Sequence, residues 1–276
     1  MIDKIYNIKK NIVIISGGAG YLGGQFSKTI SSIGGIPLIL DNNEKALKSL
    51  KKYFNKKKLK GYFFLINLNN EIEVNNIITY IYKKFKKIDS LVNAAGYTGQ
   101  AMLKNDEDFF KNFEDYKFDL WKDSLNGNLS STFLMTKAVS KLMKKNNYGT
   151  IVNIASDVGI ISPDHRIYEP DKKINYKGTK FNTPLSYSVA KSGIISMTRH
   201  LATYFAKTGI RVNCISPAGV FKKHDKKFVK KLSSRIPLGR MAKLHELDGA
   251  LIFLCSNASS FVTGHNLVVD GGRTIW

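Results

Sequence analysis

Short apolar runs alternate with amphipathic segments along almost the whole chain, and this alternation limits the fold more than any other feature of the sequence. Alternating strands and helices are typical of a parallel sheet with helical crossover connections. A strand buried on both faces is a continuous apolar run, as Ile12-Val13-Ile14-Ile15 is. The sequence therefore predicts an α/β protein with one doubly wound domain over residues 1–276 and a mostly parallel seven-stranded sheet.

The boundaries of the predicted elements follow from these patterns. The seven predicted strands are Asn11–Ser16, Ile36–Leu40, Gly61–Ile66, Ser90–Asn93, Thr150–Ala155, Ile210–Ile215 and Asn266–Val269. The six predicted helices are Gly20–Ile33, Glu44–Phe54, Ile72–Phe85, Leu120–Lys145, Leu185–Lys207 and Leu244–Cys255. Two stretches, Tyr97–Phe118 and Asp157–Pro184, fit neither pattern and are predicted to be irregular insertions, which in compact domains often bind ligands.

A glycine-rich turn, Ser16-Gly17-Gly18-Ala19-Gly20-Tyr21-Leu22-Gly23, joins the first strand to the first long helix. Glycines let the backbone approach a pyrophosphate closely, and the helix that follows offers unpaired N–H groups. Asp41 ends the second strand, 24 residues after Gly17, where a carboxylate would accept hydrogen bonds from adenosine ribose hydroxyls. It would also repel a 2′-phosphate, so NAD is favoured over NADP. The alternative is that Asp41 only caps the helix near Glu44.

Three further features bear on function: one at the end of the fourth strand, one at the start of a helix and one at the end of the fifth strand. Asn93-Ala94-Ala95-Gly96 ends the fourth strand, where small residues permit close approach of a cofactor. Tyr187 and Lys191 begin a helix at i, i+4 spacing, which places both on one face. A nearby ammonium lowers the pKa of a phenol and makes it a usable proton donor and acceptor. Ser156, at the end of the fifth strand, would hydrogen-bond a substrate oxygen beside that phenol, or would simply cap a turn.

These motifs, in this order, resemble those of the short-chain dehydrogenase/reductase family, in its single-domain branch. Further similar segments are Trp121 with Asn128-Leu129, residues 211–217 (Arg-Val-Asn-Cys-Ile-Ser-Pro), Pro237-Leu238-Gly239-Arg240, and Val262-Thr263-Gly264 with Val269-Asp270-Gly271-Gly272. The resemblance covers about residues 10–276 and implies a Rossmann-type fold that binds a nicotinamide cofactor.

The resemblance also implies roles for individual residues. Asn128, Ser156, Tyr187 and Lys191 would form the catalytic tetrad, in which Asn128 holds a water of a proton relay, Ser156 orients the substrate oxygen and Tyr187 is the general acid/base. Lys191 would bind the nicotinamide ribose and lower the pKa of Tyr187. The implied cofactor-binding residues are Gly17, Gly20, Tyr21, Leu22, Gly23, Asp41, Asn67, Leu68, Asn93, Ala94, Ala95, Gly96, Tyr187, Lys191, Pro217, Gly219 and Val220. A substrate lid is implied near residues 218–235.

The chain departs from the family pattern at three places. Tyr21 stands where the single-domain branch usually has a glycine, while Gly20 gives the Gly-x-x-Gly-x-x-Gly spacing of the extended branch. Asn67 stands where an aspartate commonly contacts adenine, and its carbonyl oxygen can still accept. The insertion between Ser156 and Tyr187 is unusually long and resembles a subgroup linked to bacterial surface-sugar or flagellin-glycan biosynthesis.

The net charge of +22 raises the question of a polyanionic partner. Of the 43 basic residues, however, 37 are lysine and six are arginine, the residue best suited to phosphate and guanine contacts. Solvated lysine faces are therefore favoured over nucleic-acid binding. Six lysines of the lid either attract an anionic substrate or are such a solvated face: Lys222, Lys223, Lys226, Lys227, Lys230 and Lys231.

Other function classes lack their sequence signals. No metal-ligand motif is present, no apolar run approaches the ~20 residues of a membrane helix, and residues 1–10 do not form a signal peptide. The two cysteines lie in apolar segments, which fits a reducing cytoplasm.

The leading hypothesis is an NAD-dependent oxidoreductase that interconverts a secondary alcohol and a ketone on a sugar-derived or other polar metabolite, as a homotetramer or homodimer. The alternatives are an NADPH-dependent 3-oxoacyl-carrier-protein reductase, and a non-catalytic protein that binds a nucleotide or a polyanion.

Overall fold

The computed structural model of the protein describes residues 2–97, 111, 113–168, 175–176, 179–180 and 182–276. Seven strands form one sheet in the order β3-β2-β1-β4-β5-β8-β9, and each neighbouring pair is parallel. These strands are β1 (Ile12–Ser16), β2 (Ile36–Asp41), β3 (Tyr62–Leu65), β4 (Ser90–Asn93), β5 (Gly149–Ile154), β8 (Ile210–Pro217) and β9 (Asn266–Val269). The predicted doubly wound, seven-stranded sheet is confirmed.

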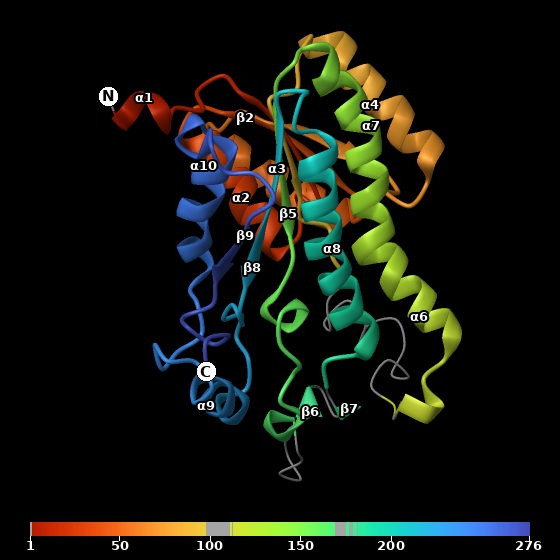
Figure 1. Ribbon diagram of the computed structural model, residues 1–276, viewed down its shortest axis with the longest axis vertical. Coiled ribbons are helices and arrows are strands. Elements are labelled where there is room, and N and C mark those ends of the chain that lie inside the picture. The colour runs from red at the N-terminus through yellow and green to blue at the C-terminus, as the bar shows by residue number, and fades with distance from the viewer. Residues whose placement is uncertain (1, 98–110, 112, 169–174, 177–178, 181) are drawn as a thin grey trace.

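Helices cover both faces of the sheet, with α2, α3 and α10 on one face and α4, α7 and α8 on the other (Figure 1). The helices are α1 (Ile2–Ile5), α2 (Tyr21–Ser32), α3 (Glu44–Lys56), α4 (Glu71–Phe85), α6 (Phe118–Leu125), α7 (Ser131–Lys145), α8 (Leu185–Tyr204), α9 (Lys226–Ser233) and α10 (Asp248–Cys255).

The central strand β1 explains why two apolar layers form. Ile12 and Ile14 belong to the core beneath α4 and α7, whereas Val13 and Ile15 belong to the core beneath α2 and α10. Successive side chains of a strand point to opposite faces, so a continuous apolar run fills both cores at once. Because β1 lies between β2 and β4, the strand order changes direction there, and a crevice is expected at the carboxyl ends of these strands.

The predicted helix Leu120–Lys145 is interrupted by a π-helical turn, Asn126–Ser130, between α6 and α7. The Asn128 side chain causes this locally, because its Nδ2 donates to the Ser124 carbonyl (2.8 Å), the acceptor that a regular helix would offer to the Asn128 backbone. Ser131 N–H then bonds to the Asn126 carbonyl, five residues back. Turns of this kind often occur at functional sites.

The two insertions are only partly described. Residues 98–110 and 112 of the first, and 169–174, 177–178 and 181 of the second, lie outside the described residues. The second contains short turns at Asp157–Gly159 and His165–Ile167, and an antiparallel pair, β6 (Asn175–Tyr176) with β7 (Thr179–Lys180), that was not predicted. It descends beyond the sheet toward α9, near the C-terminus (Figure 1).

Candidate active site

The predicted functional residues gather at one edge of the sheet, where β1, β2, β4, β5 and β8 all end. Parallel strands place their carboxyl ends on the same side, so segments far apart in sequence meet there. The ends of these strands and the segments that follow them supply the glycine turn, Asp41, residues 94–96, Ser156 and Pro217.

The glycine turn is closed tightly against its neighbours. Gly17 has a φ of +63°, and a Cβ on it would lie 2.5 Å from the Ala95 Cα atom. A Cβ on Gly23 would lie 2.2 Å from the Gly17 carbonyl oxygen, and Gly20 N–H donates to that oxygen (3.0 Å). Gly20 is the N-cap of α2. Because glycine has no side chain to cap the helix, backbone N–H groups of the first turn are left to bind an anion. The turn therefore fits a cofactor diphosphate.

Asp41 is buried and supports the glycine turn from β2. Its Oδ2 accepts from Ala19 N–H (3.0 Å), and its Oδ1 accepts from Asn43 N–H (2.9 Å). The alternative in which Asp41 caps the next helix is wrong, because Asn43 caps α3 by accepting from Ala46 N–H (3.0 Å). The carboxylate remains beside the turn, where its charge acts on any group bound there.

Other predicted cofactor residues differ in what they can offer. Asn67 follows β3 and is exposed, but its Oδ1 accepts from Asn69 N–H (3.0 Å), while Leu68 is buried. Asn93 is buried, and its Nδ2 donates to Asn153 Oδ1 (2.9 Å) and to Thr136 Oγ1. Its side chain therefore joins β4 to β5 and α7 in the interior. The backbone of the next two residues, Ala94 and Ala95, lies against Gly17 of the glycine turn.

The four predicted catalytic residues do come together at the end of β5. Lys191 is buried, and its Nζ donates to the Ile154 carbonyl (2.8 Å) and lies 5.5 Å from the centroid of the Tyr187 ring. Ser156 lies close enough to the Tyr187 hydroxyl to lower the pKa of that phenol. Gly96 lies next to both Asn128 and Lys191. A Cβ on Gly96 would be 3.4 Å from Asn128 Oδ1 and 3.8 Å from Lys191 Nζ.

The backbone of Tyr97 fixes the Asn128 amide. Asn128 Oδ1 accepts from Tyr97 N–H (3.1 Å), and its Nδ2 donates to the Ser124 and Tyr97 carbonyls. The Asn128 side chain is thus oriented by the segment that follows β4 and by its own helix.

The electrostatics of the Tyr187–Lys191 pair differ from the sequence-based expectation. Burial raises the pKa of Tyr187 to about 12 and a hydrogen bond with Ser156 opposes this, while burial lowers the pKa of Lys191 to about 8. The predicted lowering of the Tyr187 pKa by Lys191 is therefore wrong for the protein alone. The Lys191 ammonium donates to the Ile154 carbonyl and lies 5.5 Å from the centroid of the Tyr187 ring.

The lowered pKa of Lys191 makes stability depend on pH. Between about 8 and the unfolded value of about 10.4, the unfolded chain binds more protons than the native protein, so raising the pH stabilises the fold. We expect the unfolding free energy of the native protein, relative to Lys191→Met, to rise by about 2 kcal/mol between pH 8 and pH 10. Urea unfolding of both proteins at each pH measures this difference, and a flat difference would contradict the buried, titrating ammonium.

The sequence patterns did not predict a buried ion pair that lies beside Ser156. Arg273 Nε lies 3.1 Å from Asp157 Oδ2, and both side chains are 6% exposed. Asp157 Oδ1 accepts from the Ser156 hydroxyl and from Val158 N–H, both at 2.8 Å. Burial raises the pKa of Asp157 and Arg273 opposes this. The one available signal was an arginine directly after the Asp270-Gly271-Gly272 motif in a chain with six arginines.

The segment after β8, residues 218–235, is the one for which a lid was predicted. β8 ends at the buried Pro217, and Val220 forms a β-bridge with Ala242. A Cβ on Gly219 would lie 2.6 Å from Leu232 Cδ2, so the glycine lets α9 pack closely. Because these residues follow β8 at the carboxyl edge, the lid begins beside the crevice.

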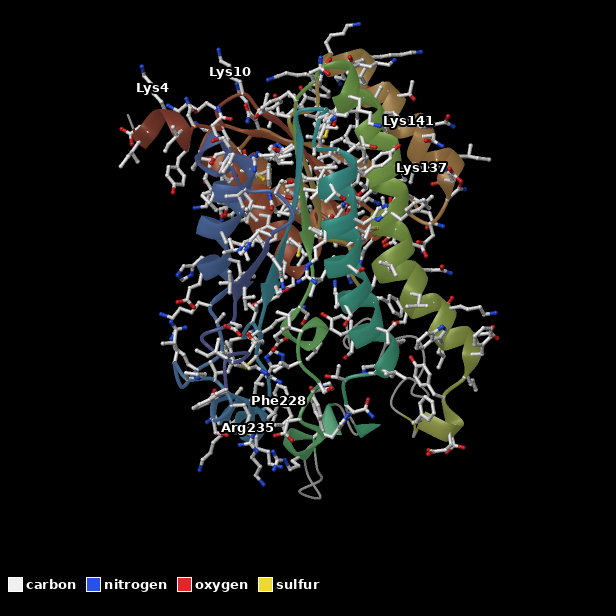
Figure 2. All side chains as sticks on the ribbon, viewed as in Figure 1. Lys4, Lys10, Lys137, Lys141, Phe228 and Arg235 are labelled. Atoms are coloured by element: carbon white, nitrogen blue, oxygen red, sulfur yellow. The ribbon has the colours of Figure 1, made fainter. Side chains whose placement is uncertain are left out.

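The second insertion packs against the lid helix α9. The Tyr168 ring stacks on the Phe228 ring (5.8 Å between centroids), and Asp164 pairs with Arg235 at 2.7 Å. Figure 2 shows Phe228 and Arg235 together at the lower end of the molecule. The second insertion and the segment around α9 thus pack against each other.

The described part of the chain lacks a metal-binding cluster and a membrane-spanning helix. It contains no group of three or more His, Cys, Asp or Glu side chains that could hold a metal ion. No helix within it is long and apolar enough to cross a membrane.

Comparison with known proteins gives matches over nearly the full length. A family model described as enoyl-(acyl carrier protein) reductase matches residues 22–274. The chain is 30% identical to post-translational flagellin modification protein A of Campylobacter coli, over 96% of this chain and 98% of that protein. It is also 30% identical to an NAD-dependent glycerol dehydrogenase of Listeria innocua, over 99% of this chain and 97% of that protein. Among solved structures, a short-chain dehydrogenase of Leptospira borgpetersenii with bound NAD+ superposes with a TM-score of 0.80 at 30% identity, covering 97% of this chain and 94% of that one.

Proposed function

Because the chain belongs to the short-chain dehydrogenase/reductase family, we propose that it interconverts a secondary alcohol and a ketone with NAD, on a sugar-derived or other polar metabolite. Members of this family are NAD(P)-dependent dehydrogenases that act on CH–OH groups, bind small-molecule substrates and usually oligomerise. The observation that carries the proposal is the meeting of Ser156, Tyr187 and Lys191 at the carboxyl end of β5, beside a glycine turn.

Each residue of the site has a separate role in the proposed reaction. When bound, the nicotinamide cofactor supplies or accepts the hydride. Tyr187 exchanges the proton of the substrate oxygen, and Ser156 holds that oxygen beside the phenol. Lys191, fixed by the Ile154 carbonyl, has ammonium protons left for ribose hydroxyls, and Asn128 holds a water that returns protons toward the surface. Residues 17–23, 41, 67–68, 93–96 and 217–220 would line the cofactor.

Cofactor choice is proposed to depend on Asp41. We expect Asp41→Asn to lower the NADH-over-NADPH affinity ratio about tenfold, because it removes the charge that repels a 2′-phosphate while keeping an acceptor for Ala19 N–H. Fluorescence titration with both cofactors measures the ratio. An unchanged ratio would show that Asp41 only supports the turn.

A sugar-derived substrate is proposed because of the similarity to the flagellin modification protein and of the long insertion below the catalytic residues. The test is a turnover screen of the purified protein with its preferred cofactor, using glycerol, xylitol, sugar phosphates and nucleotide sugars. Turnover of a polar alcohol or ketone supports the proposal.

The second candidate is an NADPH-dependent 3-oxoacyl-carrier-protein reductase. The matching family model describes carrier-protein chemistry, and an acidic carrier would be attracted to the exposed lysines of α9. Preference for NADPH together with turnover of an acetoacetyl thioester would favour it.

A non-catalytic polyanion-binding role has less support. Figure 2 shows Lys4 and Lys10 near the N-terminus and Lys137 and Lys141 on α7, apart from the lid, so these charges are spread rather than gathered into one groove. Binding to nucleic acid that weakens steeply with salt would support this role.

The assembly of the protein and its cellular compartment are further parts of the proposal. We expect the whole chain, residues 1–276, to act as one cofactor-binding domain that assembles as a homotetramer or homodimer, which light scattering would measure. The two cysteines, Cys214 and Cys255, are buried and unpaired, which supports a reducing cytoplasm.

A further inference from the structure

Tyr21 links the glycine turn to the lid, across 200 residues of sequence. It is the first residue of α2, and its hydroxyl donates to the Phe221 carbonyl. Burial raises the pKa of this phenol, so the hydroxyl remains a donor at all ordinary pH values. Tyr21, which stands where the family usually has a glycine, therefore connects the cofactor turn directly to the start of the lid.

The next lid residue, Lys222, lies against the same ring. Its Nζ is 4.7 Å from the centroid of Tyr21, a distance at which an ammonium is attracted to the face of an aromatic ring. The ring thus holds a positive charge next to the first turn of α2. That turn contains no acidic residue, and its N-terminal N–H groups carry the positive end of the helix dipole.

The backbone around Lys222 is fixed from the other side. Phe221 N–H donates to the Ala242 carbonyl (2.9 Å), and Lys222 N–H donates to His224 Nδ1 (3.1 Å). Burial lowers the pKa of His224, which keeps that nitrogen an acceptor at neutral pH. Lys222 is therefore held at the turn at both its backbone and its side chain.

We propose that Lys222 is a cofactor-binding residue whose ammonium, held over the Tyr21 ring, pairs with the diphosphate, and that the Tyr21–Phe221 contact latches the lid to the cofactor turn. The inference rests on the proposed function, since it presumes a dinucleotide in the glycine turn. It assigns to Lys222 a role different from that of Lys231, whose Nζ points to the Arg166 carbonyl (3.4 Å) at the far side of the lid.

The test is the dissociation constant of NADH, measured by fluorescence at fixed ionic strength. We expect Lys222→Met to weaken NADH about tenfold, the effect of losing one charge-assisted contact. Lys222→Arg should stay within about threefold of the native protein, because it keeps the charge. Tyr21→Phe, which keeps the ring and loses the hydroxyl, should weaken NADH by a smaller factor of about three.

Lys28→Met is the matched control. Lys28 lies in the same helix, and its Nζ is 4.5 Å from the Tyr53 ring centroid, so the change removes the same charge and the same kind of ring contact away from the turn. We expect its NADH dissociation constant to stay within about twofold of native. ADP-ribose, which contains the diphosphate, should be weakened by Lys222→Met as NADH is, whereas adenosine should not.

Two failures are distinguishable. If the native protein binds neither NADH nor NADPH, the proposed function is wrong. If the native protein binds NADH and Lys222→Met affects it no more than Lys28→Met does, only the latch is overturned. An equal weakening of adenosine and ADP-ribose would also overturn it, because the lysine would then not act through the diphosphate.

Discussion

Tyr187→Phe is expected to lower kcat at least about a thousandfold, while the NADH dissociation constant stays within about twofold of native. The change removes only the hydroxyl beside Ser156, and it leaves the ring beneath the Lys191 ammonium in place. The measurement combines steady-state turnover of the substrate found in the screen with fluorescence titration of NADH.

Tyr204→Phe is the appropriate control for this change. Tyr204 is the last residue of α8 and is exposed, so the same atom is removed from the same helix far from Ser156. Its turnover should match the native protein. Near-native turnover by Tyr187→Phe would mean that another group carries the proton, and the proposed mechanism would be wrong.

Much of the fold could be predicted because its signals are local. The run Ile12–Ile15 is apolar on both faces of the strand, and this alone requires a sheet covered by helices on two sides. The glycine turn and the Tyr187–Lys191 spacing are also local, because each depends on residues within one turn or helix. Such patterns can be read without knowing what packs against them.

The details of the site depend on contacts that sequence spacing does not reveal. Asn93 appeared to belong to the cofactor edge, yet its amide bonds to Asn153, 60 residues away, and is used in the interior. The Tyr21–Phe221 contact joins segments 200 residues apart. The pKa of Tyr187 was expected to fall, but burial, which only the folded structure fixes, raises it.

Arg273→Met is expected to lower the free energy of unfolding at neutral pH by about 3–5 kcal/mol. The change leaves the buried Asp157 carboxylate without its partner at 3.1 Å, and the attraction that offset the cost of burying that charge is lost. Because Asp157 also accepts the Ser156 hydroxyl, turnover should fall as well. Urea unfolding at pH 7 gives the stability change.

The exposed pair Arg240–Glu246 provides the control. The Arg240 guanidinium and the Glu246 carboxylate approach to 2.7 Å, but their side chains are 48% and 32% exposed, so Arg240→Met should destabilise the protein much less than Arg273→Met. Equal losses would mean that removal of the long side chain, rather than the buried charge, is responsible. The double variant Arg273→Met/Asp157→Asn should recover part of the loss, because the unpaired charge is then absent.

The pH dependence of the loss separates the charge from the packing. Burial already raises the pKa of Asp157, and removing Arg273 takes away the group that opposes this, so the folded pKa rises further. A carboxyl whose folded pKa exceeds the unfolded value of about 3.9 binds its proton more tightly in the native state, so stability falls as the pH rises between the two values. The deficit of Arg273→Met should therefore be largest at neutral pH and shrink toward pH 4, where protonation neutralises Asp157. A deficit that is constant from pH 4 to pH 7 would show that Arg273 acts through its volume, and that the carboxylate beside Ser156 does not need its charge balanced.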